Sequence, residues 1–134
     1  MTTRKPDPAK TAREAAEAIR QLNHDTLNAK EMTAPEIHDT VRALVGLVDR
    51  LPQTFEQLAG HLSKQHDAGQ TRMEDGRDPM EPVASIHMRL SQAAALLEPA
   101  NRKTYGTPAG PVSAALHDAS GQLSNMYTPW SDDE

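Results

Sequence analysis

The sequence predicts an all-α protein, a bundle of four to five helices, and two observations support this prediction. Ten prolines divide the 134 residues into pieces of helical length. Because proline lacks a backbone N–H and fixes φ, it is accepted in the first turn of a helix and excluded from its interior. Between the prolines, apolar residues recur every three or four positions, which is the period of a helix with one buried face.

The first predicted helix covers residues 7–22. Asp7 can cap its N-terminus, and Pro8 takes the first helical position. Short polar side chains compete with a helix for its backbone groups, so we expect Asn23-His24-Asp25 to break this helix. Residues 1–6, which precede it, are expected to be disordered.

A second helix is predicted from Thr33 onward. Thr33 is a good N-cap, Pro35 lies in the first turn, and Glu36 completes a capping box. The following apolar residues form a stripe with spacings of four and three: Ile37, Val41, Leu44, Val48 and Leu51. This stripe indicates a helix that buries one face.

Pro52 separates the second helix from a third. Phe55, Leu58 and Leu62 continue the apolar stripe as far as a polar stretch that begins at Asp67. The sequence leaves almost no room for a loop at Pro52, so the two helices meet either at a tight corner or in one long helix kinked there. A corner would close the stripe into a core, whereas a long helix would leave an extended face for a partner.

A fourth helix follows a flexible loop at residues 67–78, with Asp78 as its cap, Pro79 as its first residue and Pro99 at its end. A fifth helix is predicted over residues 110–126. The apolar positions of both helices again follow the helical period: Val83, Ile86, Leu90, Ala93 or Ala94 and Leu97 in one, and Val112, Ala115, Leu116, Ala119, Leu123 and Met126 in the other.

We expect a single domain over residues 7–127 and an acidic tail at residues 128–134. A chain of 134 residues is long enough for one modest hydrophobic core. Only 3% of the residues are aromatic, so the core must be built from Leu, Ile, Val and Ala, which suits close contact between helices.

The composition argues against several classes of protein. The chain has no cysteine, which excludes disulfides and thiolate-based sites. Its net charge of −5 disfavours broad binding to nucleic acid, which needs a basic face. No apolar run approaches the ~20 residues of a membrane span, and no apolar segment follows the charged N-terminus as it would in a secretory signal. We therefore expect a cytoplasmic protein with no membrane attachment.

No motif for catalysis or cofactor binding is present, so we expect no enzymatic activity, no cofactor and no metal. Two of the six histidines, His61 and His66, are five residues apart and therefore lie on different faces of a helix. The remaining histidines also lack the spacing of metal ligands: His24, His38, His87 and His117. The acidic stretch at residues 74–78 lacks the alternating oxygen ligands of an EF-hand.

Three aromatic residues are the candidate partner-binding residues. Tyr127 and Trp130 lie beside the acidic tail, and Phe55 lies in the apolar stripe. A tryptophan at a chain end can anchor an interface, and it can equally fold back over the end of a bundle. The stripe from Ile37 to Leu62 likewise serves either as the core of a monomer or as a groove for a partner.

We therefore predict a non-enzymatic helical interaction or regulatory protein that associates with a protein partner or with a second copy of itself. One alternative is a small nucleic-acid-associated regulator that contacts phosphates through Arg4-Lys5, Lys10 and Arg13, or through Arg102-Lys103. The other alternative is a metal protein or enzyme that uses histidines within the bundle.

Two stretches in the first half of the chain support a resemblance. They are Ala18-Ile19-Arg20-Gln21-Leu22-Asn23-His24-Asp25-Thr26-Leu27 and the alanine- and leucine-rich helical hairpin that ends in Leu51-Pro52-Gln53. They resemble small uncharacterised helical proteins of high-GC actinobacteria, and the bias toward Ala, Arg and Asp fits that source. The resemblance implies a cytoplasmic protein, and it implies no activity and no site residues.

Overall fold

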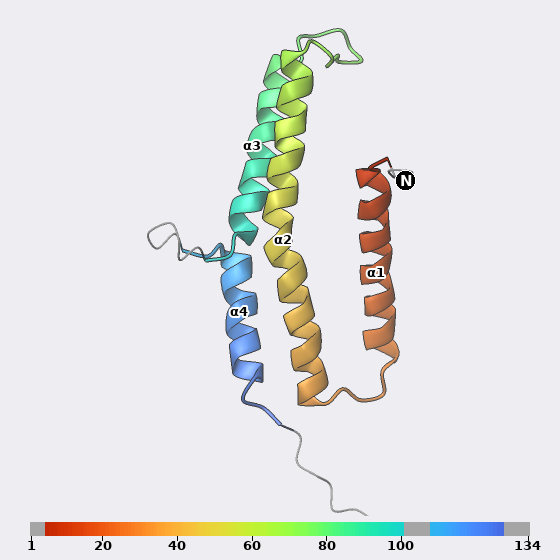
Figure 1. Ribbon diagram of the computed structural model, residues 1–134, viewed down its shortest axis with the longest axis vertical. Coiled ribbons are helices and arrows are strands. Elements are labelled where there is room, and N and C mark those ends of the chain that lie inside the picture. The colour runs from red at the N-terminus through yellow and green to blue at the C-terminus, as the bar shows by residue number, and fades with distance from the viewer. Residues whose placement is uncertain (1–4, 101–107, 128–134) are drawn as a thin grey trace, which may run out of the picture. The chain divides into compact units, whose positions relative to one another are not determined.

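The computed structural model describes residues 5–100 and 108–127, and it divides the chain into two compact units, residues 1–32 and 33–134. Within the described residues every regular element is an α-helix, so the all-α class is confirmed (Figure 1). There are four helices in this part of the chain: α1 (Pro8–Asn28), α2 (Ala34–Asp67), α3 (Met80–Leu97) and α4 (Pro111–Leu123). None of them is long and apolar enough to cross a membrane.

The first unit contains α1, which continues through the break predicted at Asn23-His24-Asp25. The side-chain amide of Gln21 donates a hydrogen bond to Asp25 Oδ1 at 2.8 Å, and the amide of Asn28 donates to the carbonyl oxygen of His24 at 2.8 Å. The predicted break is therefore wrong, because these polar side chains find partners one turn away and leave the helical backbone intact. No residue of α1 is buried.

In the second unit, α2 is one helix of 34 residues that runs through Pro52. Its start has the predicted capping box, in which Thr33 and Glu36 each accept a hydrogen bond from the other's backbone N–H at 3.3 Å. Of the two arrangements expected at Pro52, the structure therefore has one long helix and not a corner between two helices. Pro52 is buried, and α2 packs against α3 and α4, which offsets the cost of about 3 kcal/mol for a proline inside a helix.

α3 and α4 follow one another along α2 (Figure 1). α3 lies beside the C-terminal half of α2, and α4 lies beside its N-terminal half. The turn between α2 and α3 uses two residues with positive φ, Gly69 at +72° and Gly76 at +78°, a conformation that glycine adopts without strain. α3 begins at Met80 with Pro79 as its N-cap, so the predicted cap at Asp78 and first residue at Pro79 are each wrong by one position. Asp78 accepts a hydrogen bond from the backbone N–H of Met80 at 2.9 Å.

The core of the second unit is small. Among the described residues, the buried apolar side chains other than proline are Ala59 of α2 and Val83 and Ala94 of α3. Small side chains at these positions let the helices approach closely. Most of the larger apolar side chains are half-buried or exposed, so the three helices alone do not enclose them.

Gly110 lies where the start of α4 meets the end of α3. Its N–H donates a hydrogen bond to the carbonyl oxygen of Glu98 at 2.8 Å. A Cβ at this position would collide with the backbone carbonyl oxygens of Ala95 and Leu96. The absence of a side chain at residue 110 therefore allows α4 to begin against the last turn of α3.

Candidate interaction surface

One side of the three-helix unit is polar, and it includes a contact between α2 and α4. Asp49 Oδ2 lies 3.1 Å from Nε2 of His117, and the hydroxyl of the fully buried Ser113 donates to Asp49 Oδ1 at 3.5 Å. The aspartate stands between the serine and the histidine, so the histidine does not reach the hydroxyl as the base of a nucleophilic pair would. This cluster ties α2 to α4.

The same side continues along α2 toward α3. Asp67 is 18 residues, or five helical turns, beyond Asp49 and therefore lies on the same flank of α2. It lines an open hollow of about 550 Å³ together with Met80, Ala84 and His87 of α3. The flank of α3 that carries Met80, Ala84 and His87 therefore lies on the same side of the unit as Asp49. The flank of α4 that carries His117 lies on this side too. We call this surface the polar side.

The opposite side of the unit is apolar. By the helical period, Leu47, Leu51 and Leu58 lie roughly 140° to 180° around α2 from Asp49. Ile86 of α3 and Val112 and Ala119 of α4 lie on the matching flanks of their own helices, away from His87 and His117. We call these six residues the apolar face: Leu47, Leu51, Leu58, Ile86, Val112 and Ala119.

The three helices that form the apolar face do not cover it. Leu58 is 46% exposed, Ile86 47% and Val112 40%. Along α2, which is described throughout, no charged residue lies on this flank between Thr40 and Leu62. Several large apolar side chains exposed on one side of a unit in this way are typical of an interaction site.

The apolar face does not account for every exposed apolar side chain. Met80 and Met88 of α3 are also more than half exposed, and they lie on other flanks of that helix. Single exposed methionines of this kind are ordinary on protein surfaces. The distinguishing property of the apolar face is that three helices contribute to it and that α2 places no charge within it.

Of the three predicted partner-binding residues, the structure describes Phe55 and Tyr127, and these two lie apart. Phe55 is half-buried on α2, at the edge of the apolar face. Tyr127 is 79% exposed and follows the end of α4, which lies beside the other half of α2. Trp130 lies outside the described residues. Sequence periodicity located the stripe that contains Phe55, but it could not show which flank of that stripe α3 and α4 leave uncovered.

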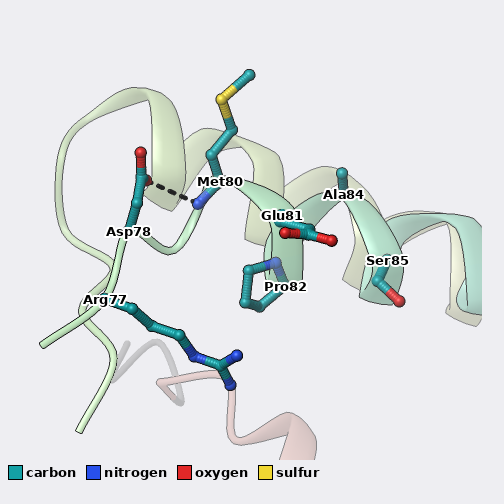
Figure 2. A pocket seen from close by; sticks show the side chains of 7 residues that line it. All are labelled: Arg77, Asp78, Met80, Glu81, Pro82, Ala84 and Ser85. Atoms are coloured by element: carbon teal, nitrogen blue, oxygen red, sulfur yellow. Dashed lines mark hydrogen bonds between the residues drawn. The ribbon is translucent and has the colours of Figure 1, made fainter. Parts of the chain in front are cut away.

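A second hollow lies outside the start of α3, and it offers no binding site (Figure 2). It is an open depression of about 760 Å³. Figure 2 shows the Met80 side chain pointing away from Arg77 and Pro82, while Asp78 accepts a hydrogen bond from the backbone N–H of Met80. The polar side chains that line this depression do not converge on one point. In a ligand pocket, by contrast, the few polar groups do converge.

The histidines and carboxylates of the described residues form no cluster of three that could hold a metal ion. Within the part of the chain that the structure describes, the Asp49–His117 pair therefore has no third neighbour of this kind. Its two members are 68 residues apart, so nothing in the sequence spacing could have predicted that they meet.

Comparison of the chain with models of protein families, with curated proteins and with solved structures finds no match in any of the three. The packing of the helices and the surface that they leave uncovered are therefore the basis for inferring a function.

Proposed function

We propose that this protein is a non-enzymatic interaction protein with a regulatory role, which associates through the apolar face of its three-helix unit. The observation that supports this proposal is an apolar face to which α2, α3 and α4 all contribute and in which α2 places no charge, with Leu58 and Ile86 nearly half exposed. We place this activity in the cytoplasm, where proteins without disulfides are usual.

The expected strength of association follows from the area available. Covering a half-exposed leucine, isoleucine or valine gains about 1 kcal/mol, so the four most exposed residues of the face, Leu47, Leu58, Ile86 and Val112, gain roughly 4 kcal/mol, and the partner's surface gains a similar amount. Association costs about 4 to 15 kcal/mol in lost translational and rotational freedom. The balance favours a reversible complex, in which each apolar residue contributes and a buried charge is not tolerated.

The test compares substitutions on and off the apolar face. The full chain is used as bait in extracts of the cells that naturally make it, and its own mass in solution is measured by light scattering. We expect association, with a partner or with itself, for the wild type and for Met88→Glu, in which an exposed methionine off the face is replaced. Leu47→Glu/Leu58→Glu should abolish it.

Two outcomes would contradict the proposal. One is a strict monomer of 14.6 kDa that retains nothing from the extract. The other is an association that Leu47→Glu/Leu58→Glu leaves unchanged, because the surface involved would then lie elsewhere. Circular dichroism of each variant establishes that the helices are still formed.

A further inference from the structure

We infer that the apolar face is covered by a second copy of this chain, with the two α2 helices antiparallel. This inference rests on the proposed function and names its partner. Three features of the molecule support it: the pattern of apolar residues along α2, the charges at the two ends of that helix and the area of the face.

The apolar pattern of α2 is the same in both directions. Its positions alternate in steps of four and three over 26 residues: Ile37, Val41, Leu44, Val48, Leu51, Phe55, Leu58 and Leu62. This is the repeat of helices that pack along their length. Three of these apolar residues, Leu44, Leu51 and Leu58, are centred on Leu51, so a second α2 turned end for end about that residue places Leu44 opposite Leu58 and Leu51 opposite its own copy.

Only part of this pattern is used within one chain. A seven-residue repeat drifts by about 20° per heptad around a straight helix, so its two series of positions lie on different flanks. Val41 and Val48 lie near the line of the buried residues Pro52 and Ala59, which faces α3 and α4. Leu44, Leu51 and Leu58 lie on the flank away from Asp49, and this flank is available to a second copy.

The charges at the ends of α2 favour the antiparallel arrangement. Glu36 lies in the first turn, and the last turn carries Lys64 and His66 together with the terminal Asp67. An antiparallel pair brings Glu36 of each helix near Lys64 of the other, and the helix dipoles are also opposed. A parallel pair would bring Glu36 beside Glu36 and Lys64 beside Lys64.

The side of the unit that carries the apolar face is large enough for a second copy. It is as long as the 34 residues of α2, about 51 Å, and two helices wide, about 18 Å, which gives a projected area of roughly 900 Å². A standard interface covers about 800 Å² on each partner. A two-fold dimer meets this requirement with the same surface on both copies, and no like charges meet on α2 at its centre.

Cysteine crosslinking tests the arrangement, because the natural chain has no cysteine. Ile37→Cys and Gln65→Cys place single thiols near opposite ends of α2, on or beside the uncovered flank. In the antiparallel dimer, residue 37 of one copy lies near residue 65 of the other, and equivalent residues are separated by about 42 Å. A bismaleimide that spans about two helical turns, ~11 Å, should therefore link a mixture of the two variants and neither variant alone.

Crosslinking of either variant to itself, with no crosslink between residues 37 and 65 in the mixture, would overturn the antiparallel arrangement in favour of a parallel one. Sedimentation equilibrium measures the strength of the association. We expect a dimer for the wild type and for Met88→Glu, and a dissociation constant raised at least about a hundredfold for Leu47→Glu/Leu58→Glu, because each copy loses buried leucine and gains a buried carboxylate.

Two results distinguish the failure of the dimer proposal from the failure of the proposed function. In the first, the wild-type chain stays monomeric and retains another protein from the extract, and Leu47→Glu/Leu58→Glu abolishes that retention. This result overturns the dimer and leaves the proposed function standing. A monomer that retains nothing overturns both.

Discussion

The two halves of α2 pack against their neighbours in different ways. The C-terminal half meets α3 across small buried apolar residues, with Ala59 only 2% exposed and Ala94 also 2% exposed. The N-terminal half meets α4 through a polar cluster in which Ser113 is buried beside Asp49. One helix thus supports two kinds of contact: the α3 half depends on close approach, while the α4 half depends on directional bonds.

The largest expected effect is at the junction between the two halves. Gly110→Ala would drive a methyl group into the carbonyl oxygens of Ala95 and Leu96, and backbone atoms cannot move aside cheaply. We expect the free energy of unfolding to fall by about 3 kcal/mol in urea titrations. Gly121→Ala is the control, since a Cβ there meets nothing within 4 Å, and it should be neutral or stabilising.

A loss at residue 110 no greater than the change at residue 121 would show that α4 does not begin against α3. The two halves of α2 would then be independent of each other, and the contrast between them would lose its physical basis.

The next effect tests the close approach in the α3 half. Ala59→Leu inserts a large side chain where α2 and α3 leave no room, and we expect a loss of about 2 kcal/mol from overpacking. Ala43→Leu, at an exposed position on the same helix, should change stability by less than ~0.5 kcal/mol. Thermal and urea unfolding measure both variants, and equal effects at the two sites would contradict the packing described for this half.

The smallest effect tests the polar cluster of the α4 half. Asp49→Ala removes the acceptor of both Ser113 and His117, and we expect a loss of about 1 kcal/mol because the histidine is half exposed. Hydrogen exchange should show α4 opening more often while α3 is unchanged. Asp39→Ala, at an exposed site on α2, is the control, and faster exchange in α3 would contradict a local role for Asp49.

Local chemistry explains the parts of the fold that could be predicted from the sequence. Caps act within four residues, so Asp7 and the Thr33–Glu36 box gave the starts of α1 and α2 correctly. The break expected at Asn23-His24-Asp25 failed because Gln21 and Asn28 satisfy these polar groups from within the helix. Local composition alone could not show this.

Pro52 and the apolar face depend on contacts between distant residues. A proline between two apolar stripes is typical of a helix end. Here α4 packs on the half of α2 before Pro52 and α3 on the half after it, and this packing makes a single helix favourable. The stripe itself was predicted from its period. Its uncovered flank could not be, because the period gives the faces of a helix and not the neighbours that cover them.

The order in which α3 and α4 follow α2 has a consequence for how the chain folds. α3 is joined to α2 by a 12-residue turn, whereas the contacts of α4 with Asp49 close loops of 64 and 68 residues. Closing a longer loop costs more entropy before any contact is gained. We therefore expect the α2–α3 hairpin to form first from the turn at Gly69, and α4 to dock afterward onto a surface that is already in place.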